Sequence, residues 1–169
     1  MNQPPFEPNA DEMLKNNAAY AAGFFEELPV APRRRMAIVA CMDSRMDMFE
    51  ILGLQRGEAH VIRNAGGIVT DDVIRSLAIS QRVLGTEEVM LIHHTDCGME
   101  KLSDDTFAAA IEAETGVKPH WSVESFRDPY ADAAQSIRRL KLSPFVPHRE
   151  HVRGFVYDVT TGQLHEVEP

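Results

Sequence analysis

One run of apolar residues, from Met36 to Ala40, limits the fold of this 169-residue chain more than any other feature. Apolar side chains at every position predict a strand buried on both faces, as in a parallel sheet that helices cover on both sides. The segments Ala59–Ile62 and Glu88–His93 are the next strand candidates. Helical patterns separate the three segments, so we expect βαβ units and an α/β fold with a mostly parallel central sheet.

The other periodic segments complete this fold. A polar cap at Thr70, followed by two acidic residues, predicts a helix that ends near Gly85. Shorter helical patterns cover about 46–54, 104–114 and 132–142. The alternating segments 152–159 and 164–167 flank a Thr-Thr-Gly turn and predict an antiparallel hairpin at the sheet edge. We find no domain boundary, so residues 1–169 are expected to form a single domain, with residues 1–35 as a helix and linker arm.

The N-terminal arm carries an amphipathic helix that is predicted from about Ala10 to Leu28, where Pro29 ends it. This helix lies outside the alternation of strands and helices. Its apolar side has no evident place in the sheet domain and consists of Leu14, Tyr20, Ala21, Phe24 and Phe25. We therefore expect the helix to pack on a neighbouring subunit.

The charge and hydropathy of the chain exclude several kinds of partner. The sequence has 17 basic and 26 acidic residues, a net charge of −9, which argues against a nucleic-acid-binding surface. No segment approaches the roughly 18 consecutive apolar residues that a membrane span needs. The segment Met1–Pro8 contains three prolines and no apolar core of a secretory signal. We therefore expect a cytoplasmic protein with neither a membrane nor a nucleic acid as partner.

Three side chains with metal-binding chemistry follow two of the predicted strands. Cys41 comes directly after the first strand, and His94 and Cys97 follow the strand 88–93. Because the carboxyl ends of parallel strands meet at one edge of a sheet, these side chains are expected to lie close together. Two thiolates and one neutral imidazole suit Zn²⁺, and three protein ligands leave one position open, as in catalytic zinc sites.

Each of these residues also has a purely structural interpretation. A cysteine at the end of a buried strand is often just a small core residue. His93 points to the opposite side of the strand from His94 and is expected to be a packing residue. Asp43 and Arg45 could form an ordinary ion pair. The joint placement at two strand ends of one sheet favours the metal site.

The order of the motifs resembles that of a known family. Cys41-x-Asp43-Ser44-Arg45, followed by His94-x-x-Cys97-Gly98, resembles the signature of the β-class carbonic anhydrases, and Arg63-Asn64-Ala65-Gly66 resembles the loop between these motifs. The similarity runs from about Met36 to Met99 and is greatest to the short bacterial branch. The resemblance implies zinc held by Cys41, His94 and Cys97, a parallel sheet, and a homodimer or larger assembly.

The resemblance also implies an activity, the reversible hydration of carbon dioxide to bicarbonate and a proton by a zinc-bound hydroxide. Asp43 is expected either to orient that hydroxide or to bind zinc as a fourth ligand, and a bidentate pair with Arg45 would hold it off the metal. Two thiolate ligands should leave the bound water less acidic than three histidines would, so activity is expected to rise with pH. Gly66 and Gly67 are candidates for the substrate pocket, or for a plain strand-to-helix turn.

Three alternatives use the same residues. The short branch also resembles enzymes that hydrolyse carbonyl sulfide or carbon disulfide on the same zinc site. A non-catalytic zinc-binding regulatory module would have Asp43 as a permanent fourth ligand. A disulfide switch between Cys41 and Cys97 is a third hypothesis, although two cysteines bound to a metal are not free to form a disulfide.

Overall fold

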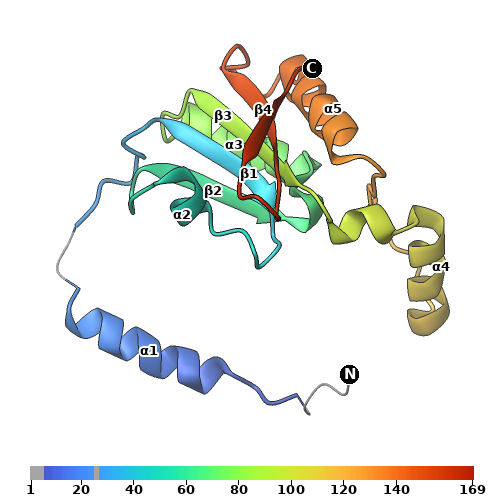
Figure 1. Ribbon diagram of the computed structural model, residues 1–169, viewed down its shortest axis with the longest axis horizontal. Coiled ribbons are helices and arrows are strands. Elements are labelled where there is room, and N and C mark those ends of the chain that lie inside the picture. Colours follow the sequence, from blue (N-terminus) through green and yellow to red (C-terminus); the bar gives the residue numbers. More distant parts are fainter. Residues whose placement is uncertain (1–5, 25–26) are drawn as a thin grey trace.

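The computed structural model describes residues 6–24 and 27–169. Figure 1 shows a twisted central sheet, with the first helix standing below it and the fourth helix at the far right. The elements are, in chain order, α1 (Ala10–Ala22), β1 (Met36–Cys41), α2 (Met48–Leu52), β2 (Ala59–Asn64), η1 (Ala65–Gly67), α3 (Asp71–Arg82), β3 (Glu88–His94), η2 (Gly98–Lys101), α4 (Asp104–Thr115), α5 (Pro129–Leu142), β4 (Val152–Tyr157) and β5 (Leu164–Val167).

The sheet has five strands in the order β2-β1-β3-β4-β5. The pairs β1·β2, β1·β3 and β3·β4 are parallel, and only β4·β5 is antiparallel. The predicted α/β fold with a mostly parallel sheet and a C-terminal antiparallel edge hairpin is therefore confirmed. The strand β1 lies between two parallel neighbours, which explains why its residues are apolar without alternation.

Two apolar clusters fill the two faces of the sheet. Ala37 and Val39 of β1 pack with side chains of α3 and α5, including Leu77 and Ile137. Ile38, from the same strand, belongs to the second cluster, which covers the other face and contains the two cysteines. The division follows from the alternation of side chains along a strand. The second face is therefore the one on which the candidate metal site lies.

The boundaries of α1 and α5 differ from those that the sequence predicts. The helix α5 begins at Pro129, three residues before the predicted start, because Asp128 caps it and proline suits a first helical position. The helix α1 ends at Ala22 and not at Leu28. The predicted continuation of α1 includes residues 25 and 26, which lie outside the described residues.

The helix α1 has no buried residue. Tyr20 and Phe24 of this arm contact Arg56, whose guanidinium carbon lies 4.8 Å from the centre of the Phe24 ring. Met13, Leu14, Tyr20 and Phe24 each expose more than half of the side chain. Within the described residues, no helix is long and apolar enough to cross a membrane.

Candidate metal centre

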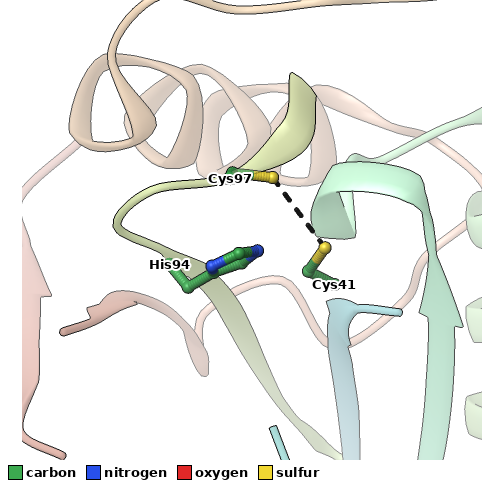
Figure 2. A group of neighbouring side chains, drawn as sticks. All are labelled: Cys41, His94 and Cys97. Atoms are coloured by element: carbon green, nitrogen blue, oxygen red, sulfur yellow. Dashed lines mark hydrogen bonds between the residues drawn. The ribbon is translucent and has the colours of Figure 1, made fainter. Parts of the chain in front are cut away.

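Three buried side chains meet at the carboxyl ends of β1 and β3. Cys41 ends β1, His94 ends β3, and Cys97 lies in the loop that follows. Figure 2 shows the two sulfur atoms and the imidazole pointing toward one another. All three ligand atoms lie within 4.8 Å of one another, and the two Sγ atoms are 3.9 Å apart. The three residues that the sequence singles out as ligands are thus brought together.

The local backbone explains this convergence. The strands β1 and β3 are adjacent and parallel, so Cys41 and His94 emerge at the same sheet edge. Asp96 takes a left-handed conformation, with φ of 54°, which turns the chain back after β3. That turn returns Cys97 to the side of His94. Asparagine and aspartate adopt this conformation more readily than most residues, so an acidic residue suits the position.

The imidazole of His94 is oriented for metal binding. Its Nδ1 lies 2.9 Å from the carbonyl oxygen of Thr95, to which it donates. The other nitrogen, Nε2, is therefore the one that carries the free lone pair. It is buried and has no hydrogen-bond partner among the described residues. A buried polar atom without a partner costs free energy, and a metal ion at this position would remove that cost.

The separation of the two sulfur atoms fits zinc. Two thiolates about 2.3 Å from a tetrahedral ion lie roughly 3.8 Å apart, close to the 3.9 Å between Cys41 Sγ and Cys97 Sγ. A disulfide would need a separation of about 2.05 Å. Both cysteines are free. The residues at this site therefore fit a zinc ion with three protein ligands and one position open to another molecule.

The two thiols differ in acidity. A hydrogen bond from Cys97 lowers the pKa of Cys41 to about 4, against the effect of burial. The same hydrogen bond, together with burial, raises the pKa of Cys97. The hydrogen bond therefore favours a thiolate at Cys41, the form that binds metal, and a bound cation would also favour loss of the Cys97 proton.

Asp43 lies beside the three ligands but is held by Arg45. Arg45 donates through Nε to Asp43 Oδ1 at 2.9 Å and through Nη2 to Oδ2 at 2.8 Å. These hydrogen bonds hold the pKa of the Asp43 carboxyl well below its usual range. Asp43 Oδ2 is also 3.7 Å from His94 Nε2, the nitrogen that faces the metal position. The carboxylate is thus next to the site while both of its oxygens bond to Arg45.

A second acid supports this pair. Arg45 also donates through Nη1 to Asp96 Oδ2 and through Nη2 to the Asp96 carbonyl oxygen, both at 3.0 Å. Lys101 donates to Asp96 Oδ1 at 2.9 Å. Neither Asp96 nor Lys101 stands out in the sequence as a candidate site residue. The only signal is the acidic residue between the two ligands of the second motif, and its partner depends on how the loop folds.

A cavity of about 620 Å³ opens onto the site. Cys41, Asp43 and Cys97 line it, and its lining is mainly apolar, including Ile68 and Met99. Other lining residues are Met42, Asn64, Ala65, Gly66, Thr70, Gly98, Leu102, Phe107, Trp121, Ser122 and Val123. This mainly apolar lining suits a small apolar substrate.

The two candidate glycines have different places. Gly66 lines the cavity, whereas Gly67 does not. A Cβ atom on Gly67 would lie 2.8 Å from Cys41 N and 3.0 Å from Ile92 O. With a φ of 70° and backbone on both sides, position 67 requires glycine so that the loop can pack against the ends of β1 and β3.

His93 lies on the opposite face of the sheet from the cavity. Its side chain is fully buried, and its Nε2 is 2.7 Å from Asp132 Oδ2 of α5. The ring of Phe126 packs against it, with centroids 5.5 Å apart. This arrangement joins β3 to α5 and is consistent with the packing role expected for His93.

The fold and the three-ligand site define a class of protein, the zinc enzymes with an open coordination position. A family profile described as "Carbonic anhydrase" matches residues 36–150. The β-carbonic anhydrase 1 of Mycobacterium tuberculosis is 58% identical over 94% of this chain and 98% of its own length. A carbon disulfide hydrolase of Saccharolobus solfataricus is 34% identical over 91% of this chain and 86% of its own. The crystal structure of a carbonic anhydrase from Streptococcus mutans superposes with a TM-score of 0.89, at 40% identity, covering 97% of this chain and 100% of that one.

The chain belongs to the carbonic anhydrase family, in its β class. It is an enzyme that hydrates carbon dioxide, and Cys41, His94 and Cys97 form its zinc site. The family suggested by the two sequence motifs is therefore confirmed.

Proposed function

We propose that this enzyme hydrates carbon dioxide in preference to carbon disulfide, with Asp43 and Arg45 as the residues that position the attacking water. The observation that carries the proposal is the hydrogen-bonded pair of Asp43 and Arg45, which keeps the carboxylate beside the metal position without occupying it. A zinc ion held by the three ligands would supply Lewis acidity, which makes water acidic enough to attack carbon dioxide near neutral pH.

Asp43 is suited to orient that water. Its carboxylate is ionised because Arg45 donates two hydrogen bonds to it, and an ionised carboxylate only accepts hydrogen bonds. A water between Asp43 and the metal position would therefore donate a hydrogen bond to the carboxylate and direct a lone pair into the cavity. This role requires that Arg45 keep Asp43 in place, because a released carboxylate could itself close the site.

The choice of substrate rests on two observations. The cavity beside the ligands is mainly apolar, which suits carbon dioxide as well as carbon disulfide. The identity to a β-carbonic anhydrase is 58%, against 34% to a carbon disulfide hydrolase. We therefore expect hydration of carbon dioxide to exceed hydrolysis of carbon disulfide.

Stopped-flow hydration of carbon dioxide tests this proposal on protein whose zinc content has been measured, from about pH 6.5 to 9. Carbon disulfide and carbonyl sulfide hydrolysis are assayed on the same preparation. We expect hydratase activity that rises with pH and dominates both hydrolase activities. Dominant hydrolase activity would overturn the substrate assignment. Full zinc occupancy without any turnover would support a non-catalytic zinc module.

The N-terminal arm, residues 1–35, is proposed to pack on a partner subunit of a homodimer, outside a single catalytic domain. Every described residue of α1 is exposed, and Met13, Leu14 and Tyr20 place apolar surface on one side of the helix. An isolated helix of 13 residues is only marginally stable in water, so packing on another chain would stabilise it.

Light scattering on two matched variants tests this packing. Leu14→Asp places a charge on the apolar side of α1, and Ala19→Asp places the same charge on the opposite side. We expect the wild-type protein and Ala19→Asp to be dimers, and Leu14→Asp to shift toward monomers. Equal masses for both variants would refute the role of α1.

A cytoplasmic location is also proposed. A reducing compartment would keep the two close thiols of Cys41 and Cys97 available for metal.

A further inference from the structure

The side chain of Arg63 contacts the backbone of the metal centre. Arg63 lies near the end of β2, the edge strand that pairs with β1. Its Nε and Nη2 donate to the carbonyl oxygen of Cys41, at 2.9 and 2.7 Å. The same Nη2 donates to the carbonyl oxygen of Asp43 at 2.7 Å. One guanidinium thus bridges the backbone of a zinc ligand and the backbone of the residue that positions water.

The next residue of β2 completes the contact. The carbonyl oxygen of Asn64 accepts a hydrogen bond from Met42 N at 2.8 Å. Three consecutive residues, 41 to 43, are therefore bonded to two consecutive residues of β2. This segment leaves the regular ladder at Cys41, where the last register pair is Cys41 with Asn64. Beyond that pair the Asp43 carbonyl oxygen accepts a hydrogen bond from Met46 N at 3.1 Å, and the Arg63 side chain adds a second, charged donor that ties this carbonyl to β2.

The charge of Arg63 is directed to these carbonyl groups. Within the described residues it forms no ion pair with a carboxylate, unlike Arg45. Arg63 does not line the main cavity, but borders a separate pocket of about 270 Å³ with Ser44, Met46 and Val61. It therefore belongs neither to the lining of the main cavity nor to the metal-binding group, and we expect any effect on the reaction to pass through the backbone of residues 41–43.

Fixing that backbone has a specific consequence. With both carbonyl groups held, the Asp43 carboxylate can change its partner only by rotation of its own side chain, while its Cα stays in place. The Cys41 sulfur is placed by the same anchored segment. A planar guanidinium with several donors in a fixed geometry can hold two carbonyl groups at once, which a single ammonium does less well.

We propose that Arg63 is a positioning residue for this zinc site: by binding the carbonyl oxygens of Cys41 and Asp43, it sets where the Cys41 sulfur and the Asp43 carboxylate lie relative to the metal. The proposal deepens the function proposed above. It concerns metal geometry, so it can be tested whether or not carbon dioxide is the preferred substrate.

The test compares Arg63→Met and Arg63→Lys with the control Arg153→Met. The control removes a guanidinium that also lies on a strand of the sheet, where it pairs with Glu166 at 2.7 Å, away from the metal site. Three quantities are measured on each full-length protein: the visible spectrum of the cobalt-substituted form, the rate of zinc loss to a chelator, and kcat and KM for hydration.

We expect Arg63→Met to change the ligand-field bands of cobalt, to accelerate zinc loss several-fold, and to lower kcat about tenfold with KM nearly unchanged. Arg63→Lys should lie between this variant and the wild type, because an ammonium retains part of the bonding. Arg153→Met should match the wild type in all three. If Arg63→Met fails to fold, Arg63→Lys still decides the outcome through the cobalt spectrum and the rate of zinc loss. Variants with reduced thermal stability but wild-type spectra, zinc loss and kcat would overturn the proposal and leave Arg63 a purely structural role.

Discussion

Arg45 binds both oxygens of the Asp43 carboxylate, at 2.9 Å through Nε and at 2.8 Å through Nη2. The two residues are separated by one position in the chain, and the Arg45 amide adds a third hydrogen bond to Oδ1 at 2.9 Å. This local pair leaves Asp43 Oδ2 3.7 Å from His94 Nε2 while both carboxylate oxygens bond to Arg45. We therefore expect the open coordination position to depend on Arg45.

Arg45→Lys should lower the hydration activity more than a substitution of Asp96 that weakens the contact between Asp96 and Arg45. Lysine keeps the charge but cannot bind both carboxylate oxygens in the same plane. We expect Arg45→Lys to reduce kcat at least about tenfold at pH 7.5, in line with the loss of a charge-assisted hydrogen bond. Steady-state hydration kinetics at matched zinc content measure the effect.

Asp96→Asn is the matched comparison for that experiment. It removes the charge of the side chain that Arg45 and Lys101 bind, and one of its two acceptor oxygens, but leaves the Asp96 carbonyl bond and the entire Asp43–Arg45 pair. Asparagine also tolerates the left-handed backbone at this position. Its loss of activity should be clearly smaller. An equal or larger loss would show that Asp96, and not the Asp43–Arg45 pair, controls the site.

Gly67→Ala should destabilise the protein and disturb the metal centre together. The added Cβ would lie 2.8 Å from Cys41 N, a backbone atom of β1 that cannot easily move away. The positive φ at this position is also unfavourable for alanine. Left-handed strain and overpacking together predict a loss of roughly 2–5 kcal/mol. Urea unfolding and zinc stoichiometry test it. The control is Gly85→Ala, which has a φ of 74° and open space around the Cβ, and so should lose only about 1 kcal/mol and keep its zinc.

Zinc removal should lower the thermal stability of the protein. Ligand binding to the folded state at a thousandfold excess over Kd contributes about 4 kcal/mol, which corresponds to roughly 10 °C in Tm for a chain of this size. Calorimetry before and after chelation, and after zinc is restored, measures this shift. Cys97→Ser should have a low Tm that chelation no longer changes. An unchanged Tm for wild-type protein that has demonstrably lost its zinc would contradict a stabilising metal site.

Asp104 should make stability depend on pH in the acid range. Ser125 donates hydrogen bonds from its hydroxyl and its amide, which lowers the pKa of the Asp104 carboxyl. A lowered pKa in the folded state means that the stabilisation is complete above the unfolded value of about 3.9 and is lost as the pH falls through the lower folded value. Because the carboxylate is largely exposed, we expect less than about 1 kcal/mol.

Urea unfolding of wild-type protein and Asp104→Asn between pH 2.5 and 6 measures that contribution. The difference in free energy of unfolding should be constant near pH 6 and should shrink toward zero at the acid end. Asp105→Asn serves as the control at the neighbouring position. A difference that grows as the pH falls would show that the sign of the pKa shift is wrong.

The sequence by itself determined the strands and the identity of the metal ligands. The apolar run from Met36 to Ala40 could only be satisfied by burial on both faces, and a parallel sheet necessarily brings its strand ends together. Cys41, His94 and Cys97 stand directly at those ends, so their convergence followed from local pattern and topology. The pairing of Asp43 with Arg45 could also be predicted from the sequence, because the two residues are only two positions apart.

The tertiary structure decided what depends on distances between remote segments. Arg63 reaches the carbonyl groups of residues 41 and 43 only because β2 pairs with β1 in one register, which no local pattern specifies. Asp96 meets Arg45 across 51 positions because a left-handed turn rotates the loop after β3. The exposure of α1 is likewise a tertiary property, because it depends on the sheet domain burying its core without contribution from this helix. Strand and ligand positions are local properties of the chain, whereas these contacts depend on where packing places separate segments.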